Sequence, residues 1–180
     1  MTDDSIKENA TVREFVETAE RFCSLIERFA DLSAYELARH SGDLLPLLYR
    51  LGLLLPDLTP NNAVTIKGSV PSDKRAEICR EVGAKFGKLN FYREVFDAYE
   101  NQEDEPVIGT IGDDISDIYS ELKDGLAIYP PSPLEAVWYW KFGFINHWGH
   151  HLVSVLKPIH HLFSNYLITE SKTDSAGNGT

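Results

Sequence analysis

The chain has 180 residues, of which 43% are hydrophobic and 25% charged, a size and composition typical of one globular domain with its own core. Its 28 acidic and 17 basic residues give a net charge of −11. This charge disfavours nucleic acid and anionic membranes as partners, whereas it favours a basic protein or a cationic ligand.

The targeting features and the cysteines indicate a cytoplasmic protein. The first ten residues are polar and contain no apolar segment of the kind found in signal peptides. The longest apolar run, residues 44–55, contains Pro46 and Arg50 and is too short to cross a bilayer. Cys23 and Cys79 lie on predicted apolar helix faces, so we expect both to be reduced core residues.

Two amphipathic helices are predicted in the first third of the chain. Residues 11–14 have the T-x-x-E form of a capping box, and apolar residues then recur three and four positions apart over about five helical turns. A second capping box at residues 33–36 opens a helix that ends near Leu55 and that Gly42 and Pro46 are expected to bend or split. Residues 1–10 are expected to be disordered.

Loops and two shorter helices are predicted for the middle of the chain. Residues 56–72 form a long loop rich in proline and glycine, and the sequence leaves its role open, functional or merely connecting. A helix is predicted from about Ser72 to Leu89, and the aromatic residues between Phe91 and Tyr99 favour a second, short helix. No segment alternates apolar and polar residues for long enough to predict more than a trace of sheet.

Two further helices follow. The first covers roughly residues 111–128. The second begins at Ser132 with a serine cap followed by proline, and it extends to Tyr166 unless Pro158 breaks or kinks it. The first of the two carries an acidic stripe, which helical periodicity places mainly away from the core: Asp114, Asp117, Glu121 and Asp124.

These elements predict an all-α, single-domain bundle of about five or six helices. The helical domain spans residues 11–168, and residues 169–180 form a disordered polar tail. The long C-terminal helix is apolar on nearly all sides in its first half, which is typical of a helix at the centre of a fold or in an interface. We therefore expect that helix to be central.

Five of the six histidines fall between His147 and His161. His147 and His151 are four residues apart, so their rings project from one face of a helix, and with Asp114 and Asp117 they would form an Fe, Mn or Zn site. Neither H-E-x-x-H nor the E-x-x-H spacing of ferritin-like di-iron proteins is present. The alternative is a merely polar helix face, and the sequence alone assigns no cofactor.

Lys141 falls within the apolar stripe of the same helix. Such a lysine either extends outward or pairs with a carboxylate, and we expect a structural ion pair with Asp114 or Asp117 rather than a catalytic lysine. A nucleophilic pair of Ser154 with His150 would lack both a nucleophile elbow and an oxyanion hole. No catalytic residue is therefore assigned, and an enzymatic role is left open without being favoured.

Two blocks of sequence resemble a known family. They are DDISDIYSELKDGL at residues 113–126, and WKF at 140–142 followed by HWGHHL at 147–152. In this order they resemble a bacterial family of helical proteins known as domain of unknown function 5063, and the resemblance extends over roughly residues 12–163. It implies an all-helical, bacterial cytosolic protein, and it implies no activity, ligand or catalytic residue.

Three classes of function are consistent with these patterns. We favour a non-enzymatic protein-interaction or adaptor domain with an unidentified and basic protein partner. It would present either the loop at residues 56–72 or a surface formed by Trp140, His147, His150 and His151. The second class is a metal-binding protein or metalloenzyme that uses His147 and His151 with carboxylates of residues 111–128. The third is a homo-oligomeric structural protein, such as a homodimer, that associates through its apolar helix.

Overall fold

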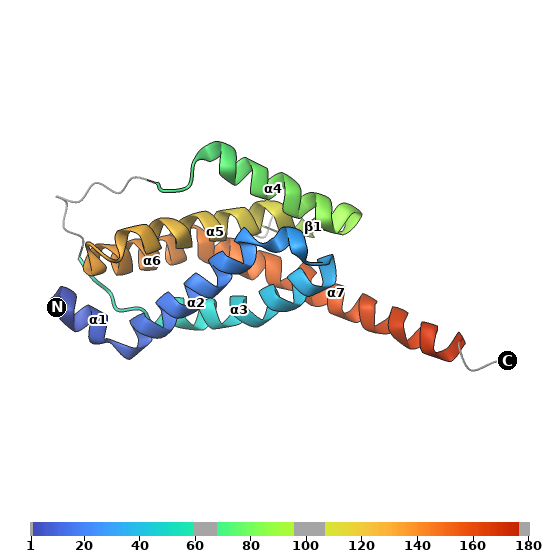
Figure 1. Cartoon of the computed structure of the whole chain (residues 1–180), viewed down its shortest axis with the longest axis horizontal. Coiled ribbons are helices and arrows are strands. Elements are labelled where there is room, and N and C mark those ends of the chain that lie inside the picture. The colour runs from blue at the N-terminus through green and yellow to red at the C-terminus, as the bar shows by residue number, and fades with distance from the viewer. Residues whose placement is uncertain (1, 60–67, 96–106, 177–180) are drawn as a thin grey trace.

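Seven α-helices, two short 3₁₀ helices and one β-hairpin form the secondary structure of the part of the chain that the computed structural model describes, residues 2–59, 68–95 and 107–176. Figure 1 shows an elongated bundle, in which the C-terminal end of the last helix extends beyond the others. The predicted all-α bundle is therefore confirmed. In chain order the elements are α1 (Asp3–Glu8), α2 (Ala10–Glu27), α3 (Ala34–Leu54), α4 (Ser72–Phe86), β1 (Phe91–Glu94), β2 (Val107–Thr110), α5 (Ile111–Ile128), α6 (Pro133–Asn146) and α7 (Trp148–Ala176).

Helix α5 occupies the centre of the bundle. It packs against α2, α4, α6 and α7, and the start of the helix also contacts β2. We expected the C-terminal helix in this position, whereas α7 packs mainly against α3, α5 and α6. One face of α5 is therefore enclosed by three other elements, α4, α7 and the hairpin, so polar side chains on that face are shielded from solvent.

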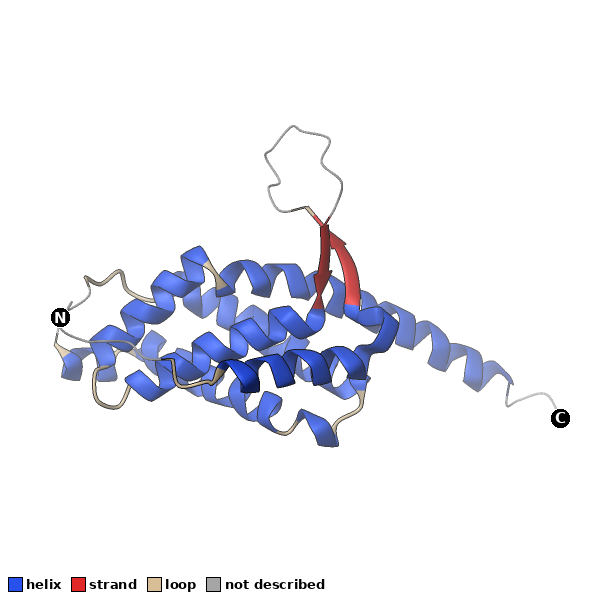
Figure 2. Cartoon of the chain, turned by 90° about the horizontal axis from the view of Figure 1, so that it is seen from above, coloured by secondary structure: helices blue, strands red, loops and turns tan. Residues whose placement is uncertain are grey.

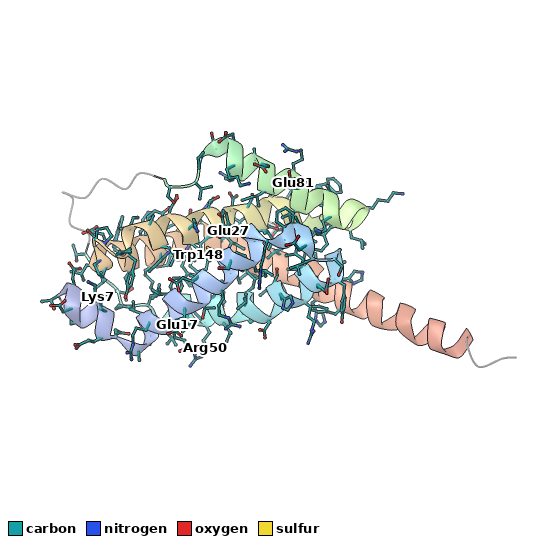
Figure 3. The ribbon with its side chains drawn as sticks, in the orientation of Figure 1. Lys7, Glu17, Glu27, Arg50, Glu81 and Trp148 are labelled. Carbon is teal, nitrogen blue, oxygen red and sulfur yellow. The ribbon has the colours of Figure 1, made fainter. Side chains whose placement is uncertain are left out.

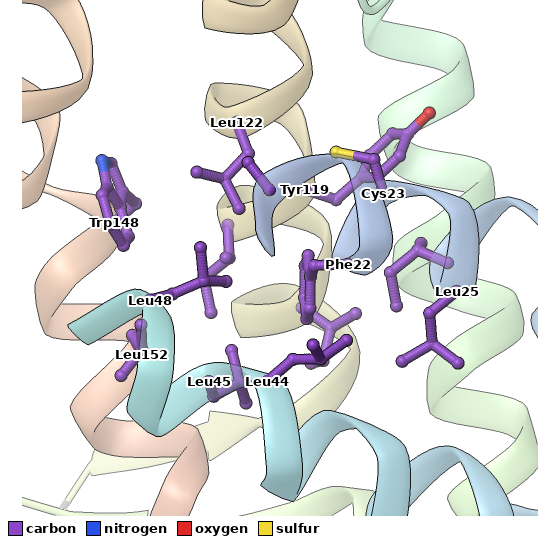
Figure 4. Packing of buried hydrophobic residues seen from close by; sticks show 14 of the residues in the cluster. Phe22, Cys23, Leu25, Leu44, Leu45, Leu48, Tyr119, Leu122, Trp148 and Leu152 are labelled. Carbon is purple, nitrogen blue, oxygen red and sulfur yellow. The ribbon is translucent and has the colours of Figure 1, made fainter. Parts of the chain in front are cut away.

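Apolar side chains from α2, α3, α5 and α7 fill the core between these helices. Figure 4 shows Phe22, Leu45, Leu48, Leu122 and Leu152 converging from the four helices, and all five are fully buried. Each buried side chain of this size contributes roughly 1.5–3 kcal/mol relative to an exposed one. This rigid core fixes the positions of the polar residues described below.

Trp140 belongs to this core, so its predicted place on an interaction surface is wrong. The side chain is fully buried, its ring centroid lies 5.0 Å from that of Phe15, and its Nε1 donates a 3.3 Å hydrogen bond to the carbonyl of Leu122. The cause is a break in the helix. The prediction treated residues from 132 onward as one continuous helix, in which the direction of each side chain follows from its position. Because α6 and α7 are separate helices, the side chains of α6 point in directions that this single helix does not predict.

The break lies at His147, between α6 and α7. His147 has φ −150° and ψ −86°, outside the helical region, and its backbone N–H still donates to the carbonyl of Gly143 at 2.8 Å. A Cβ on Gly149 would lie 2.1 Å from the carbonyl oxygen of Phe144, so the close approach at this junction requires glycine. Pro158 does not break the helix, and α7 continues to Ala176, beyond the predicted start of a disordered tail.

The N-terminal half follows the predicted helices with three differences. Helix α2 begins one residue before the predicted capping box, and the side chain of Asn9 caps it by accepting from the Val12 N–H at 3.1 Å. The capping box of Ser33 and Glu36 is confirmed, and α3 then runs unbroken through Pro46. Residues expected to be disordered form α1, which buries Ile6 completely, so that prediction is wrong for residues 3–8.

Strands β1 and β2 form an antiparallel hairpin where we predicted a short aromatic helix. Phe91 pairs with Thr110 and Glu94 with Val107, and Figure 2 shows the hairpin standing out from the helical body. Four residues per strand are too few for an alternating pattern to be recognised against helical spacing. The rest of the predicted aromatic helix and the acidic segment after it, residues 96–106, lie outside the described residues.

Charged side chains cover the outside of the bundle. Figure 3 shows Glu17, Arg50 and Glu81 extending outward from the helices, whereas Trp148 is fully buried. Among the described residues, no helix combines the length and apolar character that a membrane span requires.

Candidate metal centre

The acidic face of α5 is buried, contrary to the prediction that it lies mainly away from the core. Asp114 and Asp117 are each only 4% exposed, because α4 and α7 pack against α5 and Tyr92 of β1 contacts Asp114. Glu121 lies one turn further along the same face. Asp124, the last residue of the predicted stripe, serves another purpose, since its carboxylate accepts from the backbone N–H groups of Ser69 and Val70 just before α4, at 2.5 and 3.1 Å.

Two histidines contact these carboxylates, His147 from the junction of α6 and α7 and His151 from the first turn of α7. Nδ1 of His147 lies 2.6 Å from Oε1 of Glu121, and Nδ1 of His151 lies 2.8 Å from Oδ1 of Asp114. The second ring nitrogen of His151, Nε2, is 3.4 Å from Oδ2 of Asp117. The two imidazole centroids are 4.8 Å apart. The structure therefore brings together all four predicted metal ligands and adds Glu121, and we call these five residues the acid–histidine cluster.

Three further residues complete the surroundings of the cluster, and the sequence analysis missed all of them. The hydroxyl of Tyr92 in β1 donates to Oδ2 of Asp114 at 2.5 Å, and Arg75 of α4 forms an ion pair with Asp117. Glu94, two residues after Tyr92, accepts a hydrogen bond from the hydroxyl of Ser154. Tyr92 and Glu94 share one face of the strand, so correct prediction of a strand at residues 91–94 would have placed them together.

Two glycines permit the close approaches on which this arrangement depends. A Cβ at Gly109 of β2 would lie 2.6 Å from the ring of Tyr92, so glycine lets that ring lie flat across the hairpin toward α5. A Cβ at Gly143 of α6 would lie 2.1 Å from Oε2 of Glu121. Both contacts are shorter than carbon–carbon or carbon–oxygen packing allows, so any larger residue would displace a member of the cluster or its support.

The predicted ion pair of Lys141 with Asp114 or Asp117 is wrong. Nζ of Lys141 donates to the backbone carbonyls of Gly52 and Leu53, at 3.2 and 2.8 Å, where it satisfies the C-terminal end of α3. The side chain points toward α3 because α6 has its own helical phase. Arg75, from α4, supplies the positive charge on Asp117 instead.

Burial dominates the electrostatics of the cluster. It raises the pKa values of Asp114, Asp117 and Glu121 above those of ordinary carboxyl groups, while the hydrogen bond to Asp114 raises the pKa of His151. Among the described residues, Arg75 is the only permanently charged cation in an ion pair with any of the three carboxylates. The cluster therefore has excess negative charge when its carboxyl groups are ionised and its histidines are neutral.

The geometry of the cluster is compatible with a bound metal ion. Asp117, His147 and His151 each offer one ligand atom, and these three atoms all lie within 4.8 Å of one another. A cavity of about 530 Å³ adjoins both histidines and Asp114. Its other lining residues include Cys79, Glu94, His150 and Ser154.

Three of the remaining predicted residues are now placed. Cys79 is half-buried beside the cavity, where burial raises the pKa of its thiol, whereas Cys23 is a buried core residue with a pKa of about 12. Both are free thiols. His150 is exposed and lines the cavity without a contact to the cluster carboxylates, and its role in binding a partner stays a prediction.

Comparison with known proteins identifies the family. Residues 6–165 match the family described as "Domain of unknown function (DUF5063)". The chain belongs to this family. Protein BF1032 from Bacteroides fragilis shares the fold of this DUF5063 chain, with a TM-score of 0.76 over 87% of this chain and 94% of that one, at 20% sequence identity. No functionally curated protein matches the chain at a significant level.

Proposed function

We propose that this DUF5063 protein binds a divalent transition-metal ion at Asp117, His147 and His151. One observation carries the proposal: each histidine bonds a carboxylate of α5 through Nδ1, His147 to Glu121 and His151 to Asp114. Histidines that ligate a metal through one ring nitrogen usually donate the other to a carboxylate or carbonyl. Such a bond fixes both the tautomer and the orientation of the ring before the metal arrives.

The charge of the cluster supports the same function. Buried carboxylates are costly unless a positive charge compensates them, and Arg75 compensates only Asp117. A divalent cation between Asp117, His147 and His151 would offset the remaining negative charge. It would also explain why three carboxylates lie beneath α7, where apolar side chains could pack without the cost of removing a charged group from water.

The ligand set narrows the choice of metal. Two imidazole nitrogens and one carboxylate oxygen suit Zn²⁺, Fe²⁺ or Mn²⁺, and such three-ligand sites commonly leave further coordination positions open. The adjoining cavity of about 530 Å³ gives water or a small molecule access to those positions.

Elemental analysis of untagged protein, purified without chelator, tests the proposal. We expect about one Zn, Fe or Mn per chain, lost when His147 and His151 are both replaced by alanine. His150→Ala and His160→Ala are the matched controls, because both side chains are exposed histidines of α7 that lack a carboxylate partner among the described residues. Wild-type protein that carries no metal, and takes up none of the three during equilibrium dialysis, would contradict the proposal.

A second function is supported by an exposed apolar surface. Four large apolar side chains at the end of α3 and on α6, Leu53, Leu54, Phe142 and Ile145, are each more than half exposed. Lys141 of α6 links the two segments, because its Nζ donates to backbone carbonyls at the end of α3. Its charge is therefore already hydrogen-bonded within the chain, and these four side chains favour an apolar partner over a charged one. We propose that it associates with the same surface of a second copy.

Light scattering of wild-type protein and of the variant Leu54→Ser/Phe142→Ser tests this association. We expect a wild-type dimer and a monomeric variant. A wild-type monomer at all concentrations would exclude the dimer, and it would leave the metal centre unaffected because none of its residues belongs to this surface.

A further inference from the structure

A second cavity, of about 470 Å³, borders the other face of β1. Successive side chains of a strand point to opposite faces, so Phe91 and Arg93 face away from the side on which Glu94 meets Ser154. We call this cavity the cationic pocket. Its cationic lining residues are Lys88, Arg93 and Lys157.

The charge of the cationic pocket is unusual for this chain. Three elements supply its cations, namely the 3₁₀ turn after α4, strand β1 and helix α7, and none of its described lining residues is acidic. His160 and His161 line it as well, three and four positions after Lys157, so all three share one face of α7. The protein as a whole has a net charge of −11, so this local excess of positive charge is not an average property of the surface.

The three cations have no carboxylate partner within the described part of the chain. Lys88, Arg93 and Lys157 take part in no ion pair with another described residue, whereas Arg75 and Lys123 each do. Unpaired cations that line one cavity offer charge-assisted hydrogen bonds to an anion. Arginine in particular donates two parallel hydrogen bonds to a phosphate or carboxylate group.

The rest of the pocket is apolar and aromatic. Phe91 is 61% exposed and Leu89 46% exposed, and both line the cavity together with Tyr92. Such side chains provide a surface on which a planar ring stacks. The volume lies within the range of pockets that hold small organic ligands.

We propose that the cationic pocket binds a small ligand that carries both a phosphate group and an aromatic ring, of the class of nucleoside phosphates. Arg93, Lys88 and Lys157 hold the phosphate, and Phe91 stacks against the ring. The proposal does not rest on the metal centre, because no residue of the acid–histidine cluster lines this pocket. An acidic peptide would use the same cations, but a peptide extends beyond a cavity of this size and gains nothing specific from the aromatic wall.

Calorimetric titration of the full chain with adenosine monophosphate, adenosine, inorganic phosphate and a poly-glutamate peptide tests the proposal. We expect adenosine monophosphate to bind more tightly than adenosine or phosphate, and the variant Arg93→Gln/Lys157→Gln to lose at least about tenfold in affinity, since it lacks two charge-assisted hydrogen bonds to the phosphate. Phe91→Ala should weaken the binding of adenosine monophosphate and leave the binding of inorganic phosphate unchanged.

The control is Arg50→Gln, which removes an exposed arginine of α3 that does not line the pocket. All substituted side chains are exposed, and circular dichroism confirms that each variant folds. Equal affinity of wild type and double variant for the nucleotide would overturn the proposal. So would binding of poly-glutamate in the absence of nucleotide binding, which would assign the surface to an acidic peptide.

Discussion

Strand β1 borders two cavities of similar size, about 530 and 470 Å³, that differ in charge and in construction. On one side, the acid–histidine cluster is built on carboxylates that the fold buries or half-buries, and each carboxylate has a partner from another element. On the other side, the cations of the cationic pocket are exposed and unpaired with described residues. The fold preorganises the first site, whereas the second would be completed by the ligand that we propose for it.

Because of this difference, we expect substitutions in the two sites to change different properties of the protein. Changes in the cluster alter both metal affinity and packing, because its residues support one another. Changes in the cationic pocket alter ligand affinity alone. Among the described residues, Tyr92 alone belongs to both, since its hydroxyl donates to Asp114 and its ring lines the cationic pocket.

The largest expected effect comes from Asp117→Asn. This substitution removes a charged ligand atom, so metal affinity should fall by more than about 100-fold, beyond the 10–100-fold that changes to the partners of ligands produce. The free energy of unfolding of the metal-free variant should not fall, because burial raises the pKa of Asp117 and thus disfavours its charged form in the folded state.

Competition with a chromophoric chelator and chemical denaturation of the metal-free proteins measure the two quantities. A loss of metal affinity together with a stability loss above about 2 kcal/mol would show that Asp117 serves mainly as the partner of Arg75, as expected for a structural ion pair broken on one side.

A smaller effect is expected from Glu121→Gln and from Asp114→Asn. Each weakens the bond to Nδ1 of one histidine and leaves the proposed ligands in place, so metal affinity should fall by about 10–100-fold. Asp124→Asn is the matched control, since Asp124 lies on the same helix and holds residues 69–70 instead. Equal losses in all three variants, measured by chelator competition, would indicate a nonspecific effect of charge on the helix.

The sequence predicted the helices of this site better than it predicted the site. Stripes of apolar residues and the capping box at Ser33 and Glu36 placed most helices correctly, because these signals are local. The pairing of His147 and His151 with Asp114 and Asp117 followed from residue type and spacing. The burial of the α5 carboxylates did not, because it depends on α4, α7 and the hairpin covering that face.

Two of the three missed residues, Tyr92 and Glu94, share a physical cause. Tyr92 and Glu94 come from a strand of four residues, which is stabilised by pairing with β2 rather than by a pattern of its own. The errors for Trp140 and Lys141 both arise from the break at His147, where the chain leaves the helical region and α6 takes an independent phase. A glycine at 149 and an unusual backbone at 147 are signals of tertiary packing, and one-dimensional periodicity does not contain them.

Gly143→Ala should have an intermediate effect that separates geometry from chemistry. Its methyl group would lie 2.1 Å from Oε2 of Glu121 and 2.9 Å from the ring of Trp148, so either the carboxylate or the helix must shift. We expect a stability loss of about 1–3 kcal/mol, together with weaker metal binding, although no charged or ligating group is changed. Thermal denaturation with and without metal measures both effects, and unaltered values would mean that the junction of α5 and α6 adapts freely.

The smallest expected effect sharpens the contrast between the two sides of β1. Arg93→Gln removes an exposed charge that has no partner in the described chain, so the free energy of unfolding should change by less than about 0.5 kcal/mol and metal binding should not change. Chemical denaturation in the absence of phosphate and nucleotide is the measurement. A loss of 1 kcal/mol or more would mean that Arg93 already has a partner within the folded chain. In that case a group of the protein itself would already compensate the charge of Arg93. Arg93 would then be preorganised like the residues of the acid–histidine cluster, and it would not be free to bind a ligand.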